Sequence, residues 1–203
     1  MEITSITPTD EEGKREIFVD GAPFLRMSAE LIIKFDIHVG DTMDDARLEE
    51  LTVRAEGERA LQKAYTYLSY NALSRKTLGD KLRRAGFSDA AAELTLDRLE
   101  ELELIDDERY AQRLFETIVR TRHWGSRKIL FELKKRGVPD ETAARFAAAN
   151  DDRASAAEFF RHKYAGRDMR DPKERQRAVA GMSRNGFGYD DIRAVIAEQE
   201  DEL

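Results

Sequence analysis

The segment that decides the fold is Leu78–Phe87, LGDKLRRAGF, because its pattern returns twice along the chain. The copies are Ile129–Val138, ILFELKKRGV, and Ala178–Phe187, AVAGMSRNGF. In each copy two apolar or small residues four positions apart share one helix face, a glycine ends the helix in a left-handed conformation, and a hydrophobic residue follows that can pack back onto the helix. The three glycines are 51 and 49 residues apart. One such segment is common in all-α proteins, but three at nearly equal spacing indicate tandem repeats.

The sequence around these segments predicts three copies of a three-helix unit. A second helix is expected after each glycine, over Asp89–Leu102, Asp140–Ala149 and Asp190–Gln199, and a long helix before each unit. Residues typical of helix starts are Ser74, Ser88, Asp106 or Asp107, Ser126, Pro139 and the pair Asp171-Pro172. The fold class is therefore predicted as mostly α, and the repeats are expected over 57–104, 105–150 and 151–203.

The first 56 residues predict a small β-rich module that ends in a helix. Glu16–Val19 and Ala22–Met27 read as two short strands joined by Asp20-Gly21, since both turn positions tolerate a positive φ. Pro23 favours an edge strand, because proline cannot donate to a central ladder. Two helices are expected after the strands, Ala29–Phe35 with Ser28 as its N-cap and Asp45 to about Arg54.

Composition excludes several classes of protein. The chain has no cysteine, which rules out disulfides, thiolate metal sites and cysteine nucleophiles. No apolar run approaches the roughly 20 residues that a bilayer span needs, and the polar N-terminus is unlike a signal peptide. We therefore expect a cytoplasmic protein without membrane contact.

The motif search predicts no enzyme, no cofactor and no metal. The chain lacks the glycine-rich phosphate and dinucleotide loops and the H-E-x-x-H zinc motif. His38, His123 and His162 are isolated in sequence from one another and from carboxylates at ligand spacing, so each is expected to be a surface or half-buried side chain. Asp106-Asp107-Glu108 is interpreted as a helix cap with favourable dipole placement.

Charge is distributed unevenly, and this distribution points to a binding surface. Residues 1–58 hold 15 acidic and 6 basic side chains, whereas Arg109–Arg136 holds nine basic and two acidic ones. On a helix beginning near Asp107, three arginines would lie opposite the apolar residues, and on the next helix four cations and Phe131 would share an arc of about 120°. The predicted site consists of Arg109, Arg113, Arg120, Arg122, Arg127, Lys128, Phe131, Lys134, Lys135 and Arg136.

Two aromatic residues leave an alternative open. An aromatic on a basic surface suggests a binding hot spot or a stacking group. The alternative is a solvated helix face with Phe131 and Trp124 buried under a neighbouring repeat, and for Trp124 the two interpretations are balanced because tryptophan is usually largely buried.

The segment Leu104–Glu141, LIDDERYAQRLFETIVRTRHWGSRKILFELKKRGVPDE, closely resembles the RecX family of modulators of the bacterial recombinase RecA. The family pattern is an aspartate pair, an aromatic-alanine helix, arginines, a glycine, and a helix I-x-x-E-L-x-x-[KR]-G-[IV]. These elements correspond here to Asp106-Asp107, Tyr110-Ala111, Arg120 with Arg122, Gly125, and Ile129–Val138. Leu73–Phe87 resembles the first family repeat, whereas the third repeat departs from the pattern at Ala178 and Gly181-Met182.

The resemblance implies an elongated, curved array of three repeats that has no catalysis of its own. It also implies binding within the groove of the RecA–DNA filament and inhibition of its ATPase, strand-exchange and coprotease activities, with the chain expected as a monomer and only weak direct DNA binding. Two rival interpretations remain. One is a helix-turn-helix regulator that binds DNA directly, and the other is a helical scaffold without nucleic-acid contact.

Overall fold

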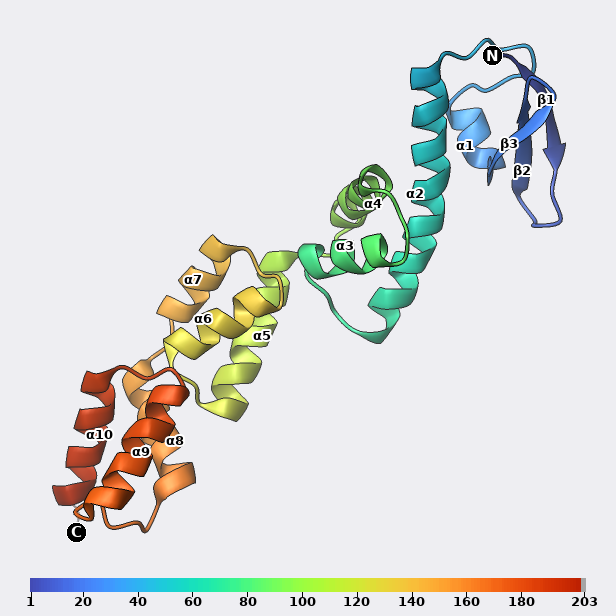
Figure 1. Ribbon diagram of the computed structural model, residues 1–203. Helices are drawn as coiled ribbons and strands as arrows, with labels where there is room; N and C mark the ends of the chain where they lie inside the picture. The colour runs from blue at the N-terminus through green and yellow to red at the C-terminus, as the bar shows by residue number, and fades with distance from the viewer. Residues whose placement is uncertain (202–203) are drawn as a thin grey trace. The chain divides into compact units, whose positions relative to one another are not determined.

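The computed structural model describes residues 1–201, with side chains through Glu198. The described chain is mostly helical, with one small antiparallel sheet at its N-terminal end (Figure 1). It divides into two compact units, one formed by Met1–Ala72 with Leu78–Leu104 and the other by Leu73–Thr77 with the chain from Ile105 onward. The mostly α fold with a β-containing N-terminal module is thus confirmed.

The sheet has three strands in the order β1 (Ile3–Pro8), β2 (Lys14–Val19) and β3 (Ala22–Ser28). β2 and β3 match the expected hairpin, whose turn residues Asp20 and Gly21 both have positive φ, 49° and 80°, and β3 is an edge strand. β1 was not predicted. The apolar residues Ile3 and Ile6 are three positions apart, and the pairing register shifts between Ile3 and Ser5. The sequence of β1 therefore lacks the regular apolar alternation that identifies a half-buried strand.

Two helices complete the N-terminal module. α1 (Ala29–Lys34) begins as expected, with Ser28 Oγ accepting the Leu31 N–H at 3.1 Å. α2 (Asp45–Tyr70) is much longer than the predicted helix and runs without a break through residue 56, where the module was expected to end. The sequence around Gly57 does not end the helix; the glycine instead allows close packing, because a Cβ there would lie 3.0 Å from the Leu94 side chain.

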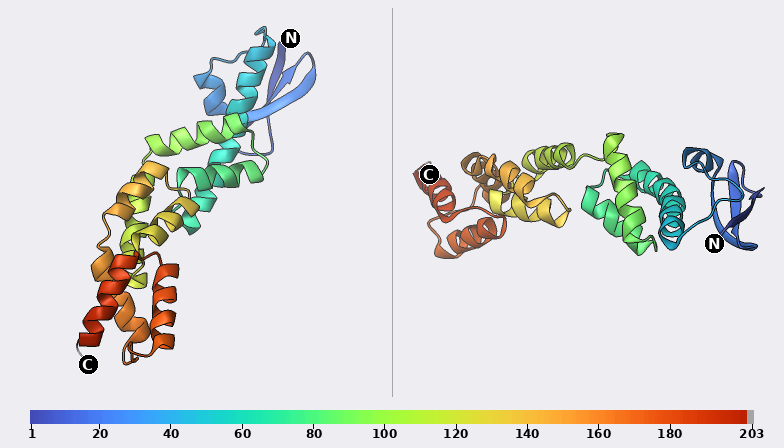
Figure 2. Two further views of the ribbon diagram at one scale, coloured as in Figure 1. Left: turned by 60° about the vertical axis from the view of Figure 1, so that its left-hand side comes forward. Right: turned by 90° about the horizontal axis from the view of Figure 1, so that it is seen from above.

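The remaining helices follow the repeat pattern. They are α3 (Arg75–Arg84), α4 (Asp89–Glu101), α5 (Asp107–Arg122), α6 (Ser126–Lys135), α7 (Asp140–Ala148), α8 (Asp152–Tyr164), α9 (Pro172–Arg184) and α10 (Tyr189–Asp201). In the second unit, α5–α7 enclose one hydrophobic core and α8–α10 another. Both views in Figure 2 show α8, α9 and α10 packed side by side.

The three glycine turns have the predicted geometry. Gly86, Gly137 and Gly186 have φ of 93°, 80° and 90°. The N–H of the following hydrophobic residue returns to the carbonyl five positions earlier in each turn, at 3.2, 3.1 and 3.4 Å. This bond and the hydrophobic contact that accompanies it end each helix in a Schellman motif.

The third repeat packs with smaller residues than the family pattern has. Ala178 and Met182 are fully buried. Gly181 leaves room for Tyr164, whose hydroxyl occupies the position that a Cβ would take. The small residues of α9 are therefore matched by a large aromatic side chain from α8.

In each of two aspartate pairs, one residue caps its own helix and the other binds the start of a different helix. Asp106 caps its own helix by accepting the Arg109 N–H at 2.9 Å, whereas Asp107 accepts the N–H of Arg75 at the start of α3, at 2.7 Å. The second pair behaves in the same way. Asp151 caps its own helix, α8, whereas Asp152 accepts the N–H of Ser126 at the start of α6. Ser126 begins α6 as expected; the N-cap residue is Gly125, and a carboxylate from the next repeat accepts the Ser126 N–H.

Candidate functional site

The phasing predicted for α5 is present in the structure. Ala111, Leu114 and Ile118 are buried against α6 and α7. Arg109, Arg113 and Arg120 are exposed. We refer to these three residues as the α5 arginine row.

α6 separates apolar and basic residues in the same way. Ile129 and Leu133 are fully buried. Exposed residues occupy the opposite side, and Phe131 is 65% exposed. Burial of Phe131 under a neighbouring repeat is thus contradicted. We refer to Arg127, Phe131, Lys134 and Lys135 as the α6 basic face.

Most cations of these two sets have no acidic partner. Lys134 Nζ lies 3.1 Å from Asp140, and Arg109 Nε lies 3.7 Å from Asp106. Arg136, next to the α6 basic face, pairs with Glu132 at 2.8 Å. Across the part of the chain that the structure describes, the cations without an ion pair in these two sets are Arg113, Arg120, Arg127 and Lys135.

Lys128 and Arg122 depart from the predicted surface. Lys128 is half-buried, its Nζ donates to Asn185 Oδ1 at 2.6 Å, and it lies 4.2 Å from the Trp124 ring centroid. Burial lowers the pKa of Lys128, partly offset by Glu132 and reinforced by the nearby Arg122. The Arg122 guanidinium lies 6.0 Å from the same ring. A helical wheel cannot foresee the contact between Lys128 and Asn185, because Asn185 comes from the next repeat.

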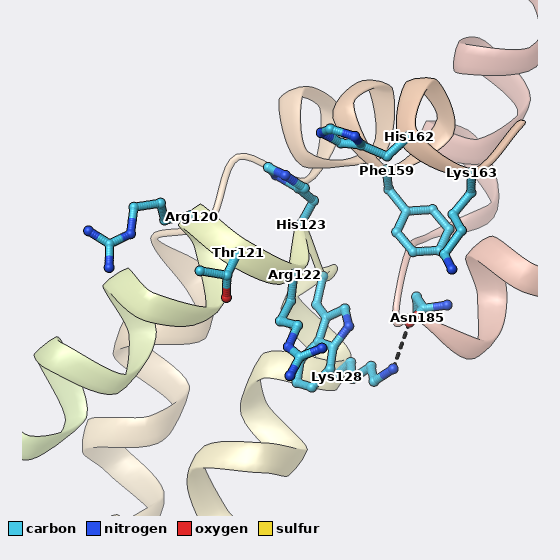
Figure 3. A pocket seen from close by; sticks show the side chains of 10 residues that line it. Arg120, Thr121, Arg122, His123, Lys128, Phe159, His162, Lys163 and Asn185 are labelled. Carbon is cyan, nitrogen blue, oxygen red and sulfur yellow. Dashed lines mark hydrogen bonds between the residues drawn. The ribbon is translucent and has the colours of Figure 1, made fainter. Parts of the chain in front are cut away.

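A cleft lies where these side chains meet (Figure 3). It has a volume of ≈ 670 Å³ and is bounded by the end of α5, the turn into α6, α8 and the end of α9. Trp124 is half-buried in its wall, so neither of the two interpretations of this residue is complete. Arg120 lies at the edge, and its guanidinium points away from α8 (Figure 3).

Sequence reasoning missed the two histidines in this cleft. His123 and His162 stack with ring centroids 5.1 Å apart and ring planes 16° apart. They are 39 positions apart in the chain, so no spacing rule brings them together. His123 is held in a left-handed conformation at the end of α5, φ 49°, which turns its side chain towards α8.

Metal-binding clusters and membrane-spanning helices are not seen among the described residues. Over residues 1–201, no group of three histidine or acidic side chains is placed to hold a metal ion. None of the helices described has both the length and the apolar character of a transmembrane span.

Comparison with known proteins identifies two parts of the chain. Residues 106–146 match the family model described as "RecX, second three-helix domain", and residues 60–99 match "RecX, first three-helix domain". Regulatory protein RecX of Bacillus velezensis is 26% identical over 203 residues, covering 98% of this chain and 77% of the relative. That of Prosthecochloris aestuarii is 29% identical over 144 residues, covering 71% and 95%.

A solved structure gives the same result for the fold. The crystal structure of a regulatory protein RecX superposes with a TM-score of 0.70 at 20% identity, covering 100% of this chain and 99% of the other. Two matched domains in the expected order, relatives along nearly the whole chain and the shared fold lead to one conclusion: this chain belongs to the RecX family.

Proposed function

We propose that this chain regulates RecA by binding the RecA–DNA filament through the α6 basic face and the α5 arginine row. The observation that carries the proposal is a 65% exposed Phe131 surrounded by cations, two of which, Arg127 and Lys135, have no ion pair in the described structure. Exposed aromatic and arginine side chains are the residues that most often dominate binding energy.

Polyanions fit this surface. Unpaired arginines and lysines bind DNA phosphates and release counterions, and they also attract acidic protein surfaces. A body attached to two neighbouring RecA subunits would resist the relative movement that ATP turnover requires, so the expected outcome is inhibition of ATPase, strand exchange and coprotease activity. The chain itself is proposed to be non-catalytic.

The experiment is charge reversal at the two unpaired cations of the α6 basic face. Arg127→Glu with Lys135→Glu should raise the concentration that half-inhibits RecA ATP hydrolysis on single-stranded DNA by about tenfold or more. Arg184→Glu with Arg193→Glu is the matched control, since both residues are exposed in the third repeat and the change in net charge is equal. Equal inhibition by both double variants would remove the α6 basic face from the proposal.

The second candidate is a regulator that binds DNA directly, favoured by the exposed basic helix α6 that follows a tight turn. Binding to bare duplex distinguishes the two. Strong sequence preference together with a steep salt dependence would favour direct recognition. Weak binding without sequence preference is expected if RecA–DNA is the target.

A further inference from the structure

We propose that the cleft between the α5–α6 turn and α8 binds phosphate groups, carried by a nucleotide or by a single nucleic-acid strand. The site differs from the α6 basic face, because Arg127, Phe131 and Lys135 do not line it. It can therefore be tested on the isolated chain and does not depend on the proposed regulation of RecA.

The first argument is charge. Among the residues that the structure describes, three cationic side chains and two histidines are directed into or along the cleft, and no carboxylate lines it. They are Arg122, His123, Lys128, His162 and Lys163.

Two carboxylates close to the cleft are already engaged. Glu158 lies 4.0 Å from His162 Nε2 but accepts from Arg161 at 2.6 Å, and Glu132, which faces Lys128, accepts from Arg136 at 2.8 Å. Several arginines elsewhere in the second unit do contact glutamates. Examples are Arg145 with Glu108, Arg153 with Glu198 and Arg167 with Glu174. The cleft concentrates positive charge that the chain itself does not neutralise.

The second argument is pre-organisation. The Lys128 ammonium is held between the Trp124 ring and Asn185 Oδ1, and Asn185 Nδ2 is itself bonded to the Gly181 carbonyl at 2.8 Å. The Gly125 N–H donates to the Asn185 carbonyl at 2.9 Å, which ties the α5–α6 turn to the end of α9. A cation fixed before binding loses less entropy when an anion arrives. Burial, reinforced by a second cation, lowers the pKa of Lys128, and a bound anion would favour the charged ammonium.

The third argument is shape. A volume of ≈ 670 Å³ is within the usual range for small-molecule sites. The flat surfaces of Trp124 and of the stacked His123–His162 pair lie beside the cations. Cations and flat rings together suit a phosphate attached to a sugar and base better than a bare inorganic anion.

The experiment uses Trp124 as the reporter, because it is the only tryptophan of the chain. Tripolyphosphate, ATP and a short oligothymidylate are titrated separately into the full chain at constant ionic strength. A saturable change in Trp124 fluorescence is expected. Lys128→Gln and, separately, Lys163→Gln should each weaken binding by about tenfold. Glutamine at position 128 can still donate a hydrogen bond to Asn185, so Lys128→Gln removes the positive charge and keeps this contact in the cleft.

Two further variants make the result decisive. Arg127→Gln with Lys135→Gln should bind as the parent does, which separates the cleft from the α6 basic face. His162→Ala changes a side chain that is 66% exposed and should weaken binding while the circular dichroism and melting temperature stay unchanged. It tests the cleft even if Lys128→Gln destabilises the fold.

The three probes identify the source of the phosphate. Saturation by ATP supports a nucleotide site, and saturation by the oligonucleotide alone supports a strand site. The proposal is overturned if none of the probes gives a saturable change. It is equally overturned if only tripolyphosphate binds, or if the cleft variants bind like the parent while Arg127→Gln with Lys135→Gln binds more weakly.

Discussion

At the scale of single residues, the second aspartate of each Asp-Asp pair performs a task that its own helix does not require. Asp152 Oδ1 accepts the Ser126 N–H at 2.8 Å and Asn150 Nδ2 at 2.6 Å, while Oδ2 accepts from Ser126 Oγ at 2.7 Å. A carboxylate at the start of α6 satisfies a helix-terminal donor and favours the positive end of the helix dipole. Asp151 has only the ordinary capping bond, to Ala154 N.

Replacing each aspartate in turn should separate these roles. Asp152→Ala should lower the free energy of unfolding by about 2 kcal/mol, because three hydrogen bonds are lost and the α6 terminus is left uncapped. Asp151→Ala should cost about 1 kcal/mol. Urea denaturation followed by Trp124 fluorescence measures both, and equal losses would contradict the role assigned to Asp152.

Glu174 makes the stability of the folded chain depend on pH. Hydrogen bonds from Arg167, at 2.7 Å, and from Arg177 lower the pKa of Glu174 below its ordinary value. The native state therefore binds this proton less readily than the unfolded chain does. The contribution is complete above the ordinary glutamate pKa and is lost as pH falls through the lowered one.

The corresponding variant is Glu174→Gln. The difference in unfolding free energy between parent and variant should shrink as pH falls from about 6 to about 3. Urea denaturation at several pH values measures it. A difference that stays constant with pH for Glu174→Gln would refute the linkage.

At the scale of elements, the glycine turns do more than end helices. A Cβ on Gly186 would lie 2.4 Å from the backbone N of Lys128, and a Cβ on Gly125 would lie 2.5 Å from Gly186. The turn after α9 thus rests directly on the first turn of α6. The turn at Gly137 lies against side-chain atoms instead, with a Cβ position 2.5 Å from Ser74 Oγ. At Gly125 and Gly186 the second and third repeats are therefore joined through backbone contact that tolerates no side chain.

Two alanine substitutions separate backbone strain from this contact. Gly166 has φ 75° and open space around it, so Gly166→Ala should cost about 1 kcal/mol from strain alone. Gly186→Ala adds the clash with α6 and should cost about 3 kcal/mol or more. Urea denaturation followed by Trp124 fluorescence compares them, and similar costs would show that the two repeats can separate without loss.

At the scale of the whole molecule, a net charge of −7 coexists with a locally basic surface. The net negative charge of the chain does not favour the approach of a polyanion. Attraction must therefore come from the cations of the α6 basic face and the α5 arginine row, acting within the screening length. The excess of acidic over basic side chains lies in the first 58 residues, which hold 15 acidic and 6 basic groups.

Salt dependence tests this local attraction. Binding to RecA–DNA filaments should weaken as salt rises, and Arg127→Gln with Lys135→Gln should reduce the slope of log affinity against log salt by about 1.5, since each phosphate contact contributes somewhat less than one. Fluorescence anisotropy of the labelled chain at several salt concentrations measures the slope. An unchanged slope would mean that these side chains do not contact phosphates.

The sequence by itself determined the helical class, the three glycine-ended repeats and the apolar faces of α5 and α6, because helix periodicity and capping are local and depend on residues within about one turn of each other. The domain boundaries stay a prediction, since α2 continues through residue 56. Only the tertiary structure decided that Lys128 donates to Asn185, that His123 meets His162, and that Asp152 caps a helix of the preceding repeat. These contacts join residues 26 to 57 positions apart, and no local pattern records which repeat packs against which.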